Sequence, residues 1–278
     1  MWFKIITNFF VVTIEKKRLS SRVMFNKTCI FILMISLLMI SNRTAKAQIN
    51  VRDSSISFVM LGGTFAYQFP GGDLADRFGN NFNVGGTFQW KTKKNWLFGI
   101  DGNFLFGEDV KENTILSKIS TRDGFIIGQD GYYADVFLYE RGFMFSGKAG
   151  KIFPVVGPNP NSGLLVTLGA GLLQHKIRIE DKGNMAPQLN DEYKKGYDRL
   201  TNGLSITEFL GYINFSNHRL VNFMAGLEFT QAFTQNRRNY NFDTMERDDK
   251  TRLDLLFGFR VAWIIPFYKR MPKEFYYN

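Results

Sequence analysis

The sequence predicts an all-β protein, an eight-stranded antiparallel up-and-down transmembrane barrel. Three observations lead to this fold class. Apolar and polar residues alternate with period 2 in eight segments, as in NFNVGGTFQW from Asn81 to Trp90. The connections between these segments are alternately long and short. Aromatic residues make up 16% of the 278 residues, and the 29 Phe are more than a soluble domain usually carries.

The two faces of each segment differ in a way that favours a membrane barrel over a soluble sandwich. The polar face of a sandwich strand is wet and carries many Lys and Glu. Here the second face carries mainly Gly, Asn, Thr and Ser with a few charges. Such residues suit the narrow, filled interior of an eight-stranded barrel, and the aromatic face suits lipid.

We expect eight strands, each long enough to cross a bilayer at a tilt, which takes about 9–11 residues. They cover Ile56–Phe69, Asn81–Trp90, Trp96–Gly107, Val136–Phe153, Leu164–Ile179, Leu204–Phe215, Leu220–Thr234 and Leu253–Tyr268. The sixth strand has the least clear alternation. For it we predict Phe209, Ile213 and Phe215 on the lipid side and Glu208, Tyr212 and Asn214 inside.

The connections set the orientation of the predicted barrel. Long polar loops are expected at Pro70–Asn80, Glu108–Asp135, Glu180–Asn202 and Gln235–Arg252, and shorter turns at Lys91–Asn95, Pro154–Gly163 and Ser216–Arg219. In outer-membrane barrels the long loops lie outside the cell, and the turns and both termini lie in the periplasm. Residues 48–55 would then be a periplasmic segment, 56–268 the barrel and 269–278 a periplasmic tail.

The first 47 residues read as an upstream segment and a secretory signal peptide. Lys27 precedes the apolar run Cys29–Ile40, and Ala45-Lys46-Ala47 supplies a cleavage site after Ala47. Met24 is the natural start of such a peptide. The apolar run has twelve residues, whereas a membrane span needs about 20, so a membrane anchor is the less favoured alternative.

Removal of residues 1–47 changes what charge and cysteine usage imply. This segment holds eight Lys or Arg and one Glu, a charge of +7, so the net charge falls from +10 to +3. The basic balance is then poor evidence for nucleic-acid binding. The only cysteine, Cys29, leaves as well, which excludes disulfides, cysteine nucleophiles and cysteine metal sites in the mature chain.

Two stretches carry a family resemblance: AYQFPGGDLADRFGNNFNVGGTFQW (Ala66–Trp90) and NWLFGIDGNFLFG (Asn95–Gly107). They resemble the amino-terminal half of small outer-membrane barrels of Bacteroidota, the broad class that includes OmpA/OmpX-like and PorT-like barrels. The resemblance implies outer-membrane insertion by the barrel-assembly machinery, which often reads an aromatic end of the last strand. Phe267-Tyr268 and the terminal Phe275-Tyr276-Tyr277 are both candidates for that signal.

The predicted interior face collects charged and titratable side chains. They are Asp101, Glu140, Lys148, His175, Glu208, Glu228, Asp254 and Arg260. Lone charges are costly in a poorly hydrated interior, so we expect them to pair in a network that fills the barrel. The alternatives are a gated path for protons or small ions and a switchable plug.

A lipid A-modifying enzyme is a further alternative, because some small barrels carry out that chemistry. It needs a nucleophile, a base and an orienting acid close together at the outer rim. Of the two His, His218 falls in a periplasmic turn, and His175 shares the predicted interior with Ser146 and Glu228. We expect His175 to be a member of the charge network instead.

Aromatic residues near the predicted strand ends indicate the membrane interfaces. They are Tyr67, Trp90, Trp96, Tyr139, Trp263 and Tyr268.

Three outer loops have features of their own. PGGDLADRFGN (Pro70–Asn80) lacks the pattern of a phosphate or calcium loop, and we expect Gly71-Gly72 to form a tight turn and Phe78 to pack over the barrel mouth. Tyr240–Arg252 mixes acids with Arg247 and Lys250, and its acids are either solvated or bridge lipopolysaccharide phosphates through divalent ions. Ser117–Tyr133 holds apolar residues that mark a partner site or, as we favour, extend the third and fourth strands as a hairpin.

The sequence therefore predicts a non-enzymatic integral outer-membrane protein without cofactor or metal. Its role would be structural or interactive, through the outer loops. The expected partners are outer-membrane lipid and lipopolysaccharide, the assembly machinery and other envelope proteins, and no nucleic acid. The second interpretation is an accessory subunit of an outer-membrane secretion or assembly machine.

Overall fold

The computed structural model describes residues 54–216 and 221–268. The predictions made for the leader up to Ala47, for His218 and for the tail 269–278 lie outside these residues.

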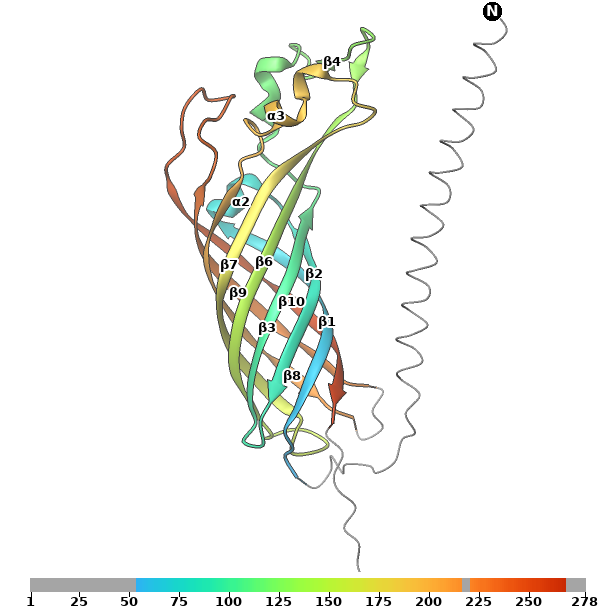
Figure 1. Ribbon diagram of the computed structural model, residues 1–278, viewed down its shortest axis with the longest axis vertical. Helices are drawn as coiled ribbons and strands as arrows, with labels where there is room; N and C mark the ends of the chain where they lie inside the picture. Colours follow the sequence, from blue (N-terminus) through green and yellow to red (C-terminus); the bar gives the residue numbers. More distant parts are fainter. Residues whose placement is uncertain (1–53, 217–220, 269–278) are drawn as a thin grey trace, which may run out of the picture. The chain divides into compact units, whose positions relative to one another are not determined.

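Eight antiparallel strands form a closed hydrogen-bonded ring, which confirms the predicted fold class (Figure 1). Along the chain they are β1 (Phe58–Gly72), β2 (Asn81–Lys91), β3 (Trp96–Gly107), β6 (Val136–Phe153), β7 (Gly163–Asp181), β8 (Thr201–Asn214), β9 (Phe223–Asn236) and β10 (Thr251–Phe267). Each barrel strand pairs with the next one along the chain, and β1 closes the ring on β10.

The register of the ring fixes the width of the barrel. A walk along directly paired residues starts at Val59 on β1 and returns to β1 at Phe69, a stagger of 69 − 59 = 10 residues. The intermediate positions are Trp90, Phe98, Ala149, Leu168, Glu208, Phe229 and Phe257. Eight strands with this stagger enclose an interior that side chains can fill.

The outward face of the ring is apolar. Large side chains such as Phe65, Phe88, Phe104 and Phe143 stay exposed on it. A continuous apolar wall of this size is unstable in water and stable in lipid. Every backbone group of a closed ring is paired within the ring, which is the condition for crossing a bilayer with strands. The barrel is therefore a transmembrane barrel of the outer-membrane type.

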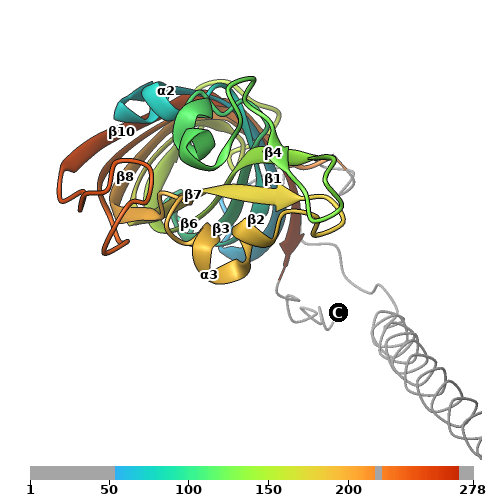
Figure 2. The same cartoon turned by 90° about the horizontal axis from the view of Figure 1, so that it is seen from above.

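Short elements cover one end of the barrel, called here the loop end; the opposite end is the turn end (Figures 1 and 2). They are α2 (Asp73–Arg77), η1 (Asn113–Ile119), β4 (Ile126–Ile127), β5 (Tyr133–Ala134), η2 (Pro187–Leu189) and α3 (Asp191–Lys194). None of the helices in residues 54–216 and 221–268 is long and apolar enough to cross a membrane.

The first connection illustrates how the sequence shapes the loop end. Gly72 has φ of 58°, and a Cβ there would lie 2.3 Å from the carbonyl oxygen of Leu253, so only glycine fits. The chain turns at this residue into α2. Phe78 then packs over the barrel mouth as expected, fully buried, with its ring edge-on to His175.

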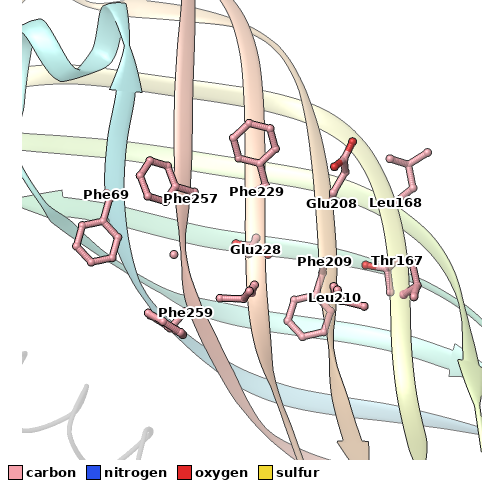
Figure 3. A pocket seen from close by; sticks show the side chains of 13 residues that line it. Phe69, Thr167, Leu168, Glu208, Phe209, Leu210, Glu228, Phe229, Phe257 and Phe259 are labelled. Carbon is pink, nitrogen blue, oxygen red and sulfur yellow. The ribbon is translucent and has the colours of Figure 1, made fainter. Parts of the chain in front are cut away.

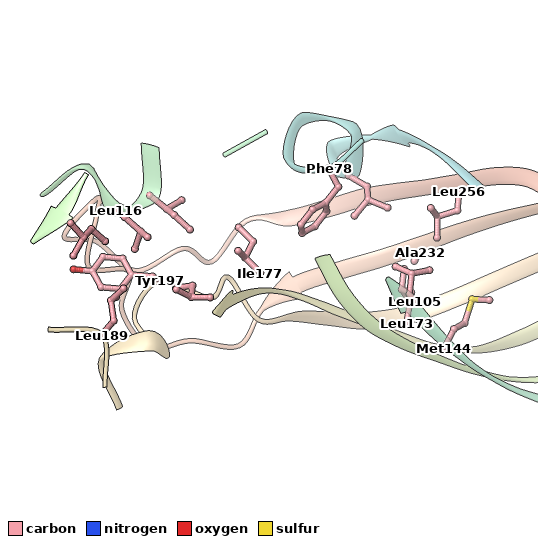
Figure 4. Packing of buried hydrophobic residues seen from close by; sticks show 14 of the residues in the cluster. Phe78, Leu105, Leu116, Met144, Leu173, Ile177, Leu189, Tyr197, Ala232 and Leu256 are labelled. Atoms are coloured by element: carbon pink, nitrogen blue, oxygen red, sulfur yellow. The ribbon is translucent and has the colours of Figure 1, made fainter. Parts of the chain in front are cut away.

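Two apolar clusters close the interior, one at each end. The turn-end cluster comprises Phe58, Met60, Leu97, Ile152, Leu165, Phe209, Ile213, Phe215, Met224, Ala262 and Ile264. The loop-end cluster joins barrel residues such as Leu105, Met144, Leu173, Ala232 and Leu256 to loop residues such as Phe78, Leu116, Leu189 and Tyr197 (Figure 4). The loop elements are thus packed onto the barrel core.

The predicted facing of the sixth strand is wrong. In β8, Phe209 and Ile213 are buried inside together with Phe215, whereas Glu208 is exposed on the outer wall. Interior space explains the reversal. An added Cβ at Gly211 would lie 2.5 Å from Cζ of Phe209, so the absence of a side chain there admits the ring. Phe209, Ile213 and Phe215 pack there within the apolar turn-end cluster, which suits them.

The lipid-facing wall leads to a testable prediction. Ile100 lies on β3 and points outward, 49% exposed. We expect Ile100→Lys to lower the free energy of unfolding in bilayers by about 2–4 kcal/mol, because a lysine there must be moved into hydrocarbon. Urea titration of the barrel in lipid vesicles measures the change. Ile100→Leu is the matched control and should alter stability by less than about 1.5 kcal/mol; equal effects of the two substitutions would contradict a lipid-facing position.

Candidate functional site

Two pairs of opposite charges lie in the middle of the barrel interior, between the apolar clusters. Lys148 on β6 and Arg260 on β10 face Asp101 on β3 and Glu228 on β9. We call these four residues the ion quartet. All four are at most 7% exposed. They come from four strands, so the quartet ties opposite walls of the barrel together.

Each charge of the quartet has an opposite charge within 4 Å, although Glu228 Oε1 and Arg260 Nε have no hydrogen-bond partner in the described part of the chain. Lys148 Nζ lies 2.5 Å from Asp101 Oδ2 and 3.4 Å from Glu228 Oε2. Arg260 pairs with Glu228 Oε2 at 2.6 Å and also with Asp101 Oδ2. Thr87 donates to the other oxygen of Asp101 at 2.7 Å. Two cations and two anions leave no net charge, which is the condition under which a buried network is tolerated.

A second polar group lies nearer the loop end. Nε2 of His175 is 2.9 Å from Oδ2 of Asp254, and Thr234 donates to the same oxygen at 2.5 Å. Glu140 accepts a hydrogen bond from Asn81 at 3.1 Å. These residues share the upper interior with the apolar loop-end cluster. The structure therefore divides the predicted interior set into the quartet, the pair of His175 and Asp254, and Glu140.

Glu208 does not belong to the interior set, contrary to the prediction. It lies on the outer wall of β8, directly opposite Leu168 on β7 and Phe229 on β9. Because Phe209, the next residue of β8, points inward, Glu208 points outward.

A lipid A-modifying enzyme would require His175, Ser146 and Glu228 to converge. Ser146 is paired with Gly171, four residues from His175 along β7, which corresponds to about 13 Å. Glu228 belongs to the ion quartet, and His175 is bonded to Asp254. The three side chains thus serve separate groups, and the hydroxyl of Ser146 makes no hydrogen bond within the described part of the chain.

A chain of ion pairs joins the four outer loops, and sequence reasoning missed it. Arg77 from the first loop pairs with Glu112 of the second at 2.9 Å. Arg199 of the third loop pairs with the same Glu112 at 3.0 Å and with Asp243 of the fourth loop. We call these four residues the loop clasp. The only hints in the sequence were isolated Arg and acidic residues, whose pairing depends on the fold.

Electrostatics act differently on the two arginines of the clasp, because burial lowers the pKa of Arg77 below its ordinary value although the charge of Glu112 acts in the opposite direction. Burial alone would lower the pKa of Arg199, but the hydrogen bonds and charges of Asp243 and Glu112 outweigh it, and the pKa lies above its ordinary value. Burial likewise opposes ionisation of Asp248, yet its contacts with Arg252 hold the pKa below the usual range. The clasp borders a cavity of about 410 Å³ with acids and bases in its lining.

Three of the four acids of the fourth loop, Asp243, Asp248 and Asp249, are paired with arginines. Asp248 pairs with Arg252 at 2.5 Å, and Asp249 pairs with Arg247 at 2.7 Å. In residues 54–216 and 221–268, no group of three or more His, Cys, Asp or Glu could hold a metal ion. These contacts do not favour the bridging of lipopolysaccharide phosphates by this loop.

The apolar part of the second loop forms a separate hairpin. The sequence favours an extension of the third and fourth barrel strands. That prediction is wrong, because β4 and β5 pair only with each other in a two-stranded sheet. Ile126 is buried in the loop-end cluster. Phe125, Ile127, Tyr132 and Tyr133 are exposed, and the rings of Phe125 and Tyr133 stack at 4.7 Å. We call these four residues the hairpin patch.

The predicted interface aromatics occupy different surroundings. Trp90 donates from its indole nitrogen to Ser57 at 3.1 Å, and Lys151 lies 5.4 Å above the ring of Trp96, both near the turn end. The ring of Tyr139 contacts the guanidinium of Arg141 near the loop end. Trp263 is exposed on β10, and Tyr67 accepts a hydrogen bond from Asn80. Tyr268 instead packs against Phe58 and the turn-end cluster.

Comparison with known proteins yields structural likeness at low identity. No protein-family model and no curated protein matches the sequence. Among solved structures, the chain is similar to Ail, the attachment invasion locus protein of Yersinia pestis, with 11% identity over 75% of this chain and 99% of that one, and a TM-score of 0.33. For OprG from Pseudomonas aeruginosa the identity is 11%, the coverage 78% and 99%, and the TM-score 0.32. The N-terminal β-barrel domain of OprF from Pseudomonas aeruginosa gives 11%, 74% and 97%, and 0.31. We take no function from these likenesses, and the fold rests on the ring of paired strands itself.

The ion quartet leads to a second prediction. Arg260→Met leaves two buried carboxylates facing one lysine, so we expect a loss of about 3–5 kcal/mol in the free energy of unfolding. Adding Glu228→Gln restores neutrality and should recover part of the loss. Urea unfolding in vesicles compares the variants. Lys151→Met on the outer face is the control, with an effect of about 1 kcal/mol or less; a similarly small effect of Arg260→Met would show that the quartet does not stabilise the barrel.

Proposed function

We propose that this protein is a non-enzymatic recognition barrel of the Gram-negative outer membrane, which binds a partner through its loop end. The hairpin patch is the observation that carries the proposal. It places aromatic and aliphatic side chains at the surface, held on a folded support. Exposed apolar residues on ordered loops are a common mark of a partner surface.

The support beneath the hairpin patch is built from backbone contacts and buried side chains. The amide of Gln129 donates to the carbonyl of Met185 at 2.8 Å, and the side chain of Gln188 donates to the carbonyl of Ile127 at 2.9 Å. Ile126 anchors the hairpin in the loop-end cluster. Because the support is already ordered, a partner would lose little free energy in fixing the loop.

The interior supports a recognition role more than a conducting one. Side chains of the turn-end cluster, the ion quartet and the loop-end cluster follow one another along the barrel axis. A barrel of this width is filled by its own side chains. Contacts with other molecules are therefore made on the outer surfaces of the barrel.

The wider cellular setting follows from the same proposal. The wall contacts outer-membrane lipid, the loop end lies beside lipopolysaccharide, and insertion uses the barrel-assembly machinery with Phe267-Tyr268 as its signal. The resemblance of Ala66–Trp90 and Asn95–Gly107 to Bacteroidota barrels of the PorT-like class supports the second candidate, an accessory subunit of a secretion or assembly machine. The lipid-facing position of Glu208 favours that candidate as well.

Site-specific cross-linking tests the recognition role. A photo-crosslinking residue at Tyr132, which is 77% exposed, should form a discrete adduct in living cells. Replacing Phe125 and Tyr133 by Ser removes their apolar surface and should reduce the adduct at least tenfold, because about 1.4 kcal/mol of lost contact energy has that effect.

The control is a photo-crosslinking residue at Val155, which is 82% exposed in the turn after β6 at the opposite end. It should yield no such adduct. If Tyr132 gives no adduct, or one that survives loss of the two rings, the hairpin patch is not the recognition surface.

A further inference from the structure

Glu208 is a charged residue on the lipid-facing wall of the barrel. Its cross-strand neighbours are Leu168 and Phe229, and its neighbours on the same face of β8 are Ile206 and Leu210. Figure 3 shows the carboxylate between Leu168 and Phe229. All four neighbours are apolar, so the side chain has hydrocarbon on every side within the wall.

The depth of Glu208 follows from its place in β8. The outward positions of this strand begin with Asn202 and end with Asn214, and Glu208 is six residues from each. Twelve residues at about 3.3 Å each, tilted by roughly 40°, span about 30 Å, the thickness of a hydrocarbon core. The carboxylate therefore lies near the middle of the bilayer.

The wall around Glu208 is hollowed. A groove of about 700 Å³ runs across β1, β7, β8, β9 and β10, and its lining is apolar apart from a few atoms. Phe69, Phe257 and Phe259 form one side of it, and Leu168 and Leu210 the other (Figure 3). The lining includes two carboxylates, of which Glu228 is buried in the ion quartet and Glu208 faces outward, so the groove is a concave apolar surface with one outward charge that another embedded segment can fill.

The charge has no counterpart within the described chain. No salt bridge or hydrogen bond involves Glu208 in residues 54–216 and 221–268, and the cations of the ion quartet point inward, to the other face of the wall. An ionisable group at this depth is expensive unless it is paired, and such residues usually mark a functional contact. A cation or a strong hydrogen-bond donor from another molecule would satisfy this carboxylate.

Two simple sources of that cation do not reach the site. Lipid head groups lie at the bilayer surfaces, about 15 Å from a residue at mid-depth. A second copy of this chain offers outward cations on its described strands only at Arg141, Lys151, Lys176 and Arg178, which lie toward the strand ends.

We propose that the wall formed by β7 to β10 docks against a transmembrane segment of a different membrane protein, and that this segment presents an arginine or lysine at mid-depth to Glu208. The aromatic groove receives the apolar side chains of the segment. The carboxylate of Glu208 fixes the depth of the docking segment and selects it by charge, since a segment without a cation at this depth leaves Glu208 unpaired. This contact is lateral and independent of the hairpin patch.

Cross-linking in native outer membranes tests the proposal. A photo-crosslinking residue at Leu210 should give one adduct with another membrane protein, whereas the same residue at Ile100 on β3 should not. Both Glu208→Lys and Glu208→Leu should reduce the adduct at least tenfold. The leucine variant suits lipid and removes only the charge, so it keeps the test valid if the lysine variant fails to fold.

Mapping the cross-linked residue completes the test. The partner should carry an arginine or lysine within one helical turn, or one strand repeat, of the cross-linked residue. Changing that arginine or lysine to glutamate should restore the adduct with the Glu208→Lys variant. An adduct only with lipid or with a second copy, an adduct unchanged in Glu208→Leu, or a partner without a cation at that depth would each overturn the proposal.

Discussion

The closure of eight strands with a ten-residue stagger is the constraint on which the rest of the structure depends. It makes the interior narrow enough for side chains to fill, and it leaves no room for bulk water around charged groups. The ion quartet answers that constraint. Asp101, Lys148, Glu228 and Arg260 compensate one another within hydrogen-bond distance, and the apolar clusters occupy the space at either end.

The filled interior places the protein's interactions on its outside. At the loop end the clasp of Arg77, Glu112, Arg199 and Asp243 connects four loops that are far apart in sequence. The hydrogen bonds of Gln129 and Gln188 and the burial of Ile126 hold the hairpin patch in place. In the wall, the position of Glu208 offers a second surface with different chemistry. One surface is suited to a partner beyond the membrane and the other to a partner within it.

Much of the barrel could be predicted from period-2 alternation, because one face of each strand must suit lipid and the other a narrow polar interior. The predicted facing of β8 is wrong for a physical reason. Phe209 and Ile213 point inward into the apolar turn-end cluster, and in the sequence they look like lipid-facing residues. The small residues Gly203, Ser205 and Thr207 indicate the inward face correctly in the half of the strand nearer the loop end. An outward carboxylate at Glu208 contradicts the general pattern, so charge alone predicts an interior position for it.

The site was less predictable than the barrel. Interior charges such as Asp101 and Arg260 follow from strand parity, but which of them pair depends on the stagger between strands, which single segments do not encode. The clasp joins residues separated by up to 166 positions, from Arg77 to Asp243, and no local pattern indicates that they meet. The hairpin was recognisable from its apolar residues, whereas its separation from β3 and β6 depends on tertiary packing.

Conductance of the purified barrel in a planar lipid bilayer tests the central claim most directly. If the ion quartet and the two apolar clusters fill the interior, the protein inserts without opening stable channels for solutes. Stable, solute-sized conductance steps from the intact barrel would contradict this account, because they require a continuous aqueous path through the region that these side chains occupy.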